Sequence, residues 1–156
     1  MFNKNQKYIA DITDIGINGE GIGKTDNFTV FINNALPNER VKYLLMKAKK
    51  NYGYGKLTNI IKPSPERVKP VCPIADKCGG CSLQHLSYPA QLKYKQELVR
   101  ENLRRIGGFE NIDVRPVIGM SDPYFYRNKE QYPIKADKNN KIMIGYYARG
   151  SHRVIN

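Results

Sequence analysis

Three closely spaced cysteines are the residues of this chain best suited to chemistry. Cys72, Cys78 and Cys81 lie in the segment C-P-I-A-D-K-C-G-G-C and are the only cysteines in the sequence. Gly79 and Gly80 relieve steric crowding where such a loop must turn tightly. Thiolates are preferred ligands of zinc and of iron–sulfur clusters. The segment therefore predicts a loop that folds around a metal.

Three interpretations of the thiols remain open at this point. A disulfide with one free thiol is disfavoured, because no segment resembles a signal peptide for an oxidising compartment. A zinc site completed by His85 is the second, although only Cys78 and Cys81 have the short spacing of a common zinc-binding half. The third, which we prefer, is an iron–sulfur site whose fourth ligand is a distant cysteine.

The basic charge of the chain is concentrated in one stretch. The net charge is +12, and residues 40–70 carry nine basic side chains against the single acidic Glu66. Such a surface favours polyanions, which release counterions when they bind. Aromatic rings among lysines are also suited to stacking on unpaired bases. We therefore predict RNA-binding residues in this stretch, against the alternative of an ordinary solvated face: Lys47, Lys49, Lys50, Tyr52, Tyr54 and Lys56.

Short apolar runs at close spacing predict a small antiparallel β-barrel in the first part of the chain. We expect strands over residues 7–15, 28–32, 41–48 and 55–61. A glycine-rich segment, residues 16–23, is expected to form tight turns between strands, because it lacks the G-x-G-x-x-G spacing of a phosphate-binding loop. Three prolines at positions 63, 65 and 70 then indicate a linker.

One helix is predicted over residues 88–106. Ser87 is a suitable N-cap, Pro89 lies in the first turn, and Gly107 follows the last turn. Strands are expected again over residues 114–118, 126–136 and 142–147, and another apolar stretch begins at 152. Alternation along the second of these strands places Arg127 and Lys129 on one side, where we predict further contacts to RNA, against the alternative of an ordinary exposed strand face.

The predicted fold class is mainly β with one α-helix. We expect a barrel over residues 1–62, a linker and cysteine loop over residues 63–88, and a small α+β domain over residues 89–156. The last strand pattern breaks off at the end of the sequence, which indicates an incomplete domain because unpaired edges are a liability. No run of about 18 apolar residues exists, so no membrane span is expected.

The order of these features resembles a known family. The cysteine motif and helix are followed by Y-R-N-K-E-Q-Y-P-I at 126–134 and G-Y-Y-A-R-G-S-H-R-V-I at 145–155. This order is similar to the N-terminal part of the RumA/TrmA-type RNA uracil-5 methyltransferases, especially the ribosomal-RNA branch, which carries an N-terminal TRAM domain. The resemblance covers essentially the whole chain and is most specific at 72–86 and 126–129. It implies an OB-like TRAM barrel at residues 1–62 that binds RNA.

The resemblance also implies a [4Fe–4S] cluster. Cys72, Cys78 and Cys81 match the first three cysteine ligands, and the fourth would follow the S-H-R-V-I segment, beyond residue 156. In the family, the domain that binds S-adenosylmethionine carries the nucleophilic cysteine and the catalytic base. We therefore expect no catalytic residue and no S-adenosylmethionine-binding residue within this sequence.

The expected function is that of an RNA-binding N-terminal fragment of an S-adenosylmethionine-dependent 23S rRNA (uracil-5-)-methyltransferase, inactive on its own. We expect a cytoplasmic, monomeric protein whose partner is RNA, most of all ribosomal RNA. The alternative is a free-standing RNA-binding module, stapled by a metal and without enzymatic activity.

Overall fold

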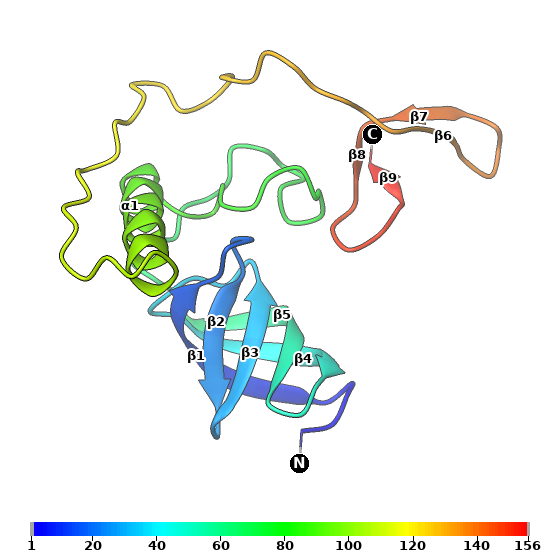
Figure 1. Cartoon of the computed structure of the whole chain (residues 1–156). Helices are drawn as coiled ribbons and strands as arrows, with labels where there is room; N and C mark the ends of the chain where they lie inside the picture. Colours follow the sequence, from blue (N-terminus) through cyan, green and yellow to red (C-terminus); the bar gives the residue numbers. More distant parts are fainter. Residues whose placement is uncertain (1, 156) are drawn as a thin grey trace.

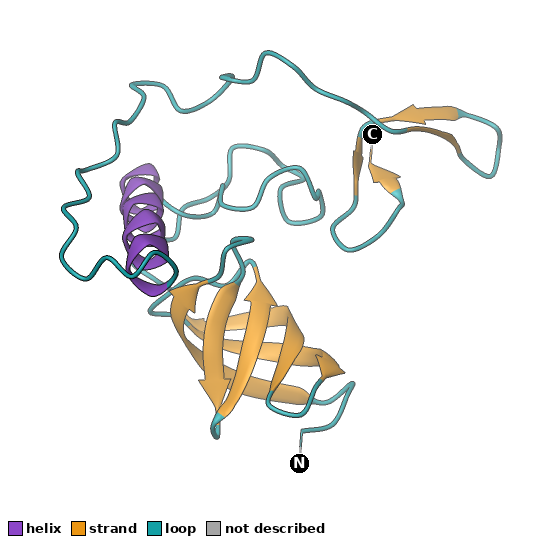
Figure 2. Cartoon of the chain, in the orientation of Figure 1, coloured by secondary structure: helices purple, strands orange, loops and turns teal. Residues whose placement is uncertain are grey.

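A closed five-stranded β-barrel forms the first part of the chain, with strand order β1-β2-β3-β5-β4 (Figures 1 and 2). The computed structural model describes residues 2–155. The barrel strands are β1 (Lys7–Ile15), β2 (Gly21–Thr25), β3 (Phe28–Asn33), β4 (Arg40–Ala48) and β5 (Tyr52–Lys62). Neighbouring strands are antiparallel except β3 and β5, which pair in parallel and so close the barrel.

Alternation of side chains builds the barrel core. In β3 and β4 every second residue points inward, and Val30, Ile32, Val41, Tyr43 and Leu45 are fully buried. Each buried aliphatic side chain of this size contributes roughly 1.5–3 kcal/mol to folding. The four strands predicted from the sequence are confirmed, although β5 begins at Tyr52 rather than at residue 55.

The glycine-rich segment was predicted as turns only, and that prediction is partly wrong. Residues 16–19 do form a turn, closed by a hydrogen bond from the Gly19 N–H to the Gly16 carbonyl oxygen. Gly21 and Gly23, however, lie in β2. A Cβ at Gly21 would approach the Ala35 carbonyl oxygen to 2.6 Å, and one at Gly23 would approach that of Asp11 to 2.7 Å. Close backbone packing, rather than turning, explains these two glycines.

Helix α1 (Tyr88–Arg105) confirms the predicted helix and its N-cap. The Ser87 hydroxyl accepts a hydrogen bond from the Ala90 N–H, and basic side chains in the last turn complement the helix dipole. The helix lies at one end of the barrel (Figure 1), and the Tyr94 hydroxyl donates to the Gly16 carbonyl oxygen at 2.8 Å. None of its residues is buried, so α1 rests only lightly on the barrel.

Residues after α1 form less strand than the sequence predicts. The strands are β6 (Ile134–Ala136), β7 (Ile142–Ile144), β8 (Tyr146–Tyr147) and β9 (Val154–Ile155), in two separate two-stranded sheets. Residues 114–118 and 126–133 form no strand, so the alternation argument for Arg127 and Lys129 is wrong. Ile118 and Phe125 are 97% and 96% exposed. These segments neither pack on an apolar core nor pair with another strand, so no interaction stabilises a β conformation there.

A buried ion pair joins the barrel to the linker that follows it. Glu39, whose side chain is fully buried, accepts hydrogen bonds from Arg67 at both carboxylate oxygens, at 2.5 and 2.9 Å. The backbone N–H groups of Leu36 and Ser64 donate to the same carboxylate. Arg67 also donates to the Asn34 carbonyl oxygen at 2.6 Å. Each oxygen of the Glu39 carboxylate therefore accepts one hydrogen bond from Arg67 and one from a backbone N–H.

Burial alone raises the pKa of Glu39, but the hydrogen bonds from Arg67, Leu36 and Ser64 and the charge of Arg67 together hold it below 4.5. The folded state thus favours the carboxylate form. Its contribution to stability is present above pH 4.5 and is lost as the pH falls through the lowered value.

His85 is buried beside this ion pair and is 6% exposed. The Val68 N–H donates to its carbonyl oxygen at 3.0 Å, and the His85 Nε2 has no hydrogen-bond partner among residues 2–155. Burial lowers the pKa of His85 to about 4, helped by the positive charges of Arg67 and Arg149 and opposed by the negative charge of Glu39. The imidazole is therefore neutral at physiological pH.

Among the residues that the structure describes, no helix is both long and apolar enough to cross a membrane.

Substitution of Arg67 by Met tests the buried pair. The change leaves the Glu39 carboxylate buried and without its counter-ion, so we expect the free energy of unfolding to fall by about 3–5 kcal/mol. Urea titration at neutral pH measures it. Arg40→Met is the matched control, because Arg40 and Asp11 form an exposed pair at 3.8 Å, for which about 1 kcal/mol or less is expected. Equal losses in the two variants would contradict the role of Arg67.

Substitution of His85 by Gln tests the buried imidazole. The unfolded chain takes up a proton near pH 6.5, whereas folded His85 resists protonation down to about pH 4. Wild-type stability should therefore fall by up to about 3 kcal/mol between these pH values, and His85→Gln should flatten that fall. Thermal unfolding as a function of pH measures it, with His152→Gln, the exposed second histidine, as control. An unchanged slope in His85→Gln would refute the prediction.

Candidate functional site

The predicted RNA-binding residues of the barrel lie together on the β4–β5 hairpin. We call residues 47–56 the basic hairpin. Its turn is closed by a hydrogen bond from the Lys49 N–H to the Tyr52 carbonyl oxygen at 2.8 Å. All six predicted side chains are exposed: Lys47, Lys49, Lys50, Tyr52, Tyr54 and Lys56. Gly53 and Gly55 alternate with the tyrosines and face the core.

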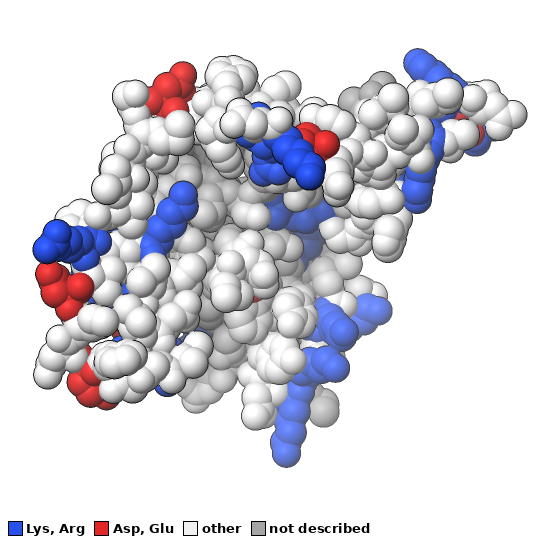
Figure 3. Space-filling model, turned by 45° about the horizontal axis from the view of Figure 1, so that its top comes forward, with Lys and Arg blue, Asp and Glu red and all other residues white. Residues whose placement is uncertain are grey.

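Basic side chains are not confined to this hairpin. Figure 3 shows them in several separate groups on the face in view, where they outnumber acidic side chains. The chain therefore presents distributed positive charge, and the basic hairpin is the part of it in which lysines and exposed tyrosines occur together.

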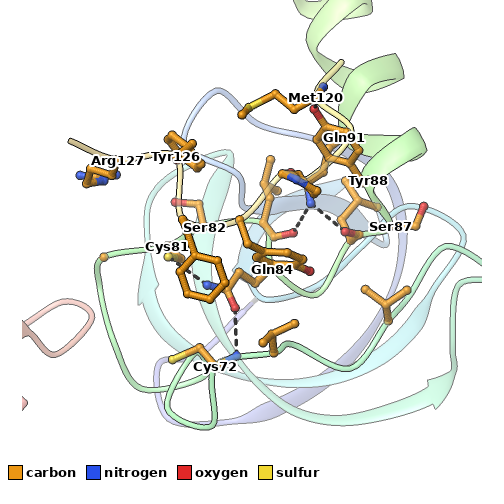
Figure 4. Close-up of a pocket in the computed structure, with 18 of the residues that line it drawn as sticks. Cys72, Cys81, Ser82, Gln84, Ser87, Tyr88, Gln91, Met120, Tyr126 and Arg127 are labelled. Carbon is orange, nitrogen blue, oxygen red and sulfur yellow. Dashed lines mark hydrogen bonds between the residues drawn. The ribbon is translucent and has the colours of Figure 1, made fainter.

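The cysteine loop, residues 72–86, is held by its own hydrogen bonds. Gln84 links its two ends, because its Oε1 accepts from the Cys72 N–H at 3.3 Å and its Nε2 donates to the Cys81 sulfur at 3.2 Å (Figure 4). The Gly80 N–H donates to the Cys78 sulfur at 3.4 Å. Two of the three sulfurs therefore accept a hydrogen bond from within the loop.

The C-terminal part of the chain holds the other side of this loop. Cys78 pairs with Ala148 as an isolated β-bridge, and the Gly79 N–H donates to the Tyr147 carbonyl oxygen at 2.9 Å. The Arg149 guanidinium donates to the carbonyl oxygens of Cys81, at 2.5 Å, and Cys78, at 3.4 Å. The loop is thus fixed between the linker and the β8–β9 sheet. Sequence reasoning missed the part played by Arg149, because no local pattern distinguishes it from an ordinary surface arginine.

The three thiols are free, so no disulfide closes the loop. Within residues 2–155 no three His, Cys, Asp or Glu side chains converge closely enough to hold a metal ion, and His85 does not join the cysteines. The donor set still fits a thiolate-bound group, because all three sulfurs lie on one short loop and two accept N–H hydrogen bonds. The metal assignment of Cys72, Cys78 and Cys81 stays a prediction.

A cavity of about 870 Å³ lies between the cysteine loop, α1 and residues 120–127. Cys72, Cys81, Tyr126 and Arg127 line it (Figure 4). Arg127 is exposed and forms an ion pair with Glu130 at 2.8 Å, whereas Lys129 is exposed but does not line the cavity. Arg127 and the tyrosines of the basic hairpin line different cavities. Contact of Arg127 and Lys129 with RNA stays a prediction.

A match to one protein-family model supports the barrel assignment. Residues 2–58 match the model of the TRAM domain family. The solution structure of a conserved protein from Methanococcus maripaludis is a distant match, with a TM-score of 0.35 and 24% identity over 36% of this chain and 81% of that one.

Relatives extend the similarity to almost the whole chain. An uncharacterized RNA methyltransferase of Clostridium tetani is 50% identical over 97% of this chain and 33% of its own length. Those of Halalkalibacterium halodurans and Clostridium acetobutylicum are 46% and 47% identical, over 98% and 97% of this chain and 33% of their own length. The chain thus spans about one third of these curated relatives. Residues 2–58 thus match the TRAM domain, and almost the whole chain is similar to RNA methyltransferases over about one third of their length.

Proposed function

We propose that this chain is the RNA-binding N-terminal part of an S-adenosylmethionine-dependent 23S rRNA (uracil-5-)-methyltransferase. The observation that carries the proposal is an exposed basic hairpin on a TRAM barrel, in a chain about half identical to RNA methyltransferases. The ribosomal target and the uracil base follow from the resemblance of the cysteine and Y-R-N-K segments to that branch. We place the protein in the cytoplasm, where thiols stay reduced, as a monomer.

Electrostatics supplies the first part of the proposed function. Lys47, Lys49 and Lys50 precede and form the hairpin turn, and Lys56 lies further along β5, all of them exposed. Lysines on a rigid hairpin meet phosphates without first being ordered, which reduces the entropic cost of binding. Such contacts are independent of sequence and weaken as salt rises.

Positioning the target is the second part. A uracil can be methylated at C5 only when it is unstacked and presented to the enzyme. The barrel would grip RNA beside the target, and the chemistry would be carried by a domain for which this chain supplies no catalytic residue. Binding of RNA without methylation is therefore the activity we propose for residues 1–156.

An iron–sulfur cluster is the cofactor we propose for the cysteine loop. Free thiols at Cys72, Cys78 and Cys81 and the N–H donors of Gly80 and Gln84 support it. Methyl transfer demands no redox step, so the cluster would serve to fix the loop against residues 146–149. Metal binding of this kind contributes folding free energy directly. The second candidate, a metal-stapled RNA-binding module without enzymatic activity, shares this loop and the basic hairpin.

Charge reversal tests the RNA-binding proposal. Lys49→Glu with Lys50→Glu should weaken binding to single-stranded RNA and lower the slope of log affinity against log salt by about 0.7 for each phosphate that is no longer neutralised. Fluorescence anisotropy over a range of salt concentrations measures both. Lys4→Glu with Lys7→Glu changes the charge equally, outside the basic hairpin, and is the control. Unchanged affinity and slope in the hairpin variant would favour an ordinary solvated face.

Serine substitution tests the cluster. After anaerobic reconstitution with iron and sulfide, Cys72→Ser, Cys78→Ser and Cys81→Ser should each lower bound iron per chain and the thermal midpoint relative to wild type. Iron and sulfide analysis and visible absorption measure the loss. Ser82→Ala, next to Cys81, is the control. Full retention of iron in Cys78→Ser, the most buried of the three, would contradict the proposal.

A further inference from the structure

Three aromatic rings are in mutual contact on the outer surface of the barrel. We call Phe31, Tyr52 and Tyr54 the ring cluster. The ring centroid of Phe31 lies 5.9 Å from that of Tyr52 and 5.6 Å from that of Tyr54, and the centroids of the two tyrosines are 5.8 Å apart. Tyr52 and Tyr54 are 38% and 44% exposed, and Phe31 is partly exposed.

Strand register creates this cluster. Phe31 on β3 pairs with Tyr54 on β5 in parallel, and Thr29 pairs with Tyr52. Phe31 also pairs with Ile22 on β2, while Tyr54 pairs with Lys47 on β4. One row therefore crosses four strands, with the two rings in its middle and a lysine at its end. A rigid sheet holds the rings, so their arrangement is fixed before any ligand arrives.

The ring cluster differs from the other aromatic cluster of the barrel. Phe2 and Tyr8 contact Phe28 or Tyr43 and pack against the core, so burial explains their rings. The rings of Phe31, Tyr52 and Tyr54 do not belong to that core packing. They instead line an open cavity of about 480 Å³, together with Thr29 and Asn51. Core packing therefore does not account for them.

The surroundings of the ring cluster favour a nucleotide. Lys47 pairs with Tyr54, while Lys24 and Lys56 pair with Thr29 and Asn33 on β3. Lysines beside a stack of rings suit a ligand that carries a flat base and a phosphate together. Thr29 and Asn51 add groups that can hydrogen-bond to the edge of a base.

We propose that the ring cluster is a stacking platform for unpaired bases of RNA, in which Phe31 of β3 is the third ring beside Tyr52 and Tyr54 of β5. The proposal rests on the RNA-binding function proposed above and adds the form of RNA that is recognised. A base stacks on an exposed ring only when it is free of its own helix, so the platform selects single-stranded segments over duplex. Stacking tolerates every base, since each has a π face.

The test compares three RNA probes by fluorescence anisotropy: a short single-stranded oligouridylate, the same strand with abasic positions, and a duplex of the same length. We expect wild type to prefer the first probe. Tyr54→Leu and Phe31→Leu should lose roughly 5- to 150-fold in affinity for it, the equivalent of about 1–3 kcal/mol for one stacked base. Affinity for the abasic strand and the salt slope should stay as in wild type, because the lysines remain.

Conservative variants separate stacking from a loss of folding. Tyr54→Phe keeps the ring and should bind as wild type, and Phe109→Leu, an exposed aromatic beyond α1, is the control. Phe31→Trp introduces the single tryptophan of the chain, whose fluorescence should change on binding oligouridylate and not the abasic strand. Circular dichroism confirms that each variant is folded.

The outcomes distinguish the two proposals. Equal affinity of wild type for the normal and abasic strands, or wild-type binding by Tyr54→Leu and Phe31→Leu, overturns the stacking platform and leaves salt-dependent RNA binding intact. If the leucine variants lose affinity equally for the normal and the abasic strand, the rings have a structural role, and the stacking platform is also overturned. If wild type binds none of the probes, the RNA-binding function itself fails, and the platform with it.

Discussion

The buried pair of Glu39 and Arg67 is the interaction on which the arrangement of the rest depends. Glu39 belongs to the barrel, and Arg67 belongs to the linker, where it forms a β-bridge with Leu86 at the end of the cysteine loop. The next residue of that segment, Ser87, caps α1 and donates its N–H to the Glu66 carbonyl oxygen. The Arg67 side chain thus holds the linker on the barrel, and backbone hydrogen bonds of Glu66 and Val68 join the same segment to the end of the cysteine loop and the start of α1. A buried carboxylate without its counter-ion costs free energy. The ion pair therefore favours a single position of the linker on the barrel.

The two parts of the chain differ in what stabilises them. The barrel has a closed hydrogen-bonded sheet and its own core, so its surface is rigid enough to present lysines and rings in fixed positions. Beyond α1, Ala148 and Val154 are the buried residues among those described, and Ile118, Phe125 and Ile134 are largely exposed. The β8–β9 sheet is held against the cysteine loop by the hydrogen bond from Arg149 to Cys81 and by the β-bridge between Ala148 and Cys78. Exposed apolar surface of this extent is typical of a region that contacts further protein or RNA.

Local patterns were readable from the sequence, and contacts between distant segments were not. The alternation in β3 and β4 and the Ser87 cap depend on neighbouring residues, and both predictions are confirmed. Strand β2 was missed because its glycines are required by close contact with the backbone of Ala35 and Asp11, which lie elsewhere in the sequence. Phe31 was missed because only the parallel register of β3 with β5 brings it to Tyr54. Strands after α1 were over-predicted, since alternation there lacks a pairing partner.

The Y-G-Y-G alternation at the start of β5 links the core to the surface that would meet RNA. A Cβ at Gly55 would lie 2.5 Å from the Tyr43 ring, so glycine there lets that buried ring fill the barrel. With glycines turned inward, period-two geometry must turn Tyr52 and Tyr54 outward, toward Phe31. The ring cluster is therefore a consequence of how the core is packed, and a one-residue slip of β5 would exchange glycines and tyrosines between core and solvent. The register of β5 that places Gly53 and Gly55 in the core also fixes the positions of the exposed rings before any base binds.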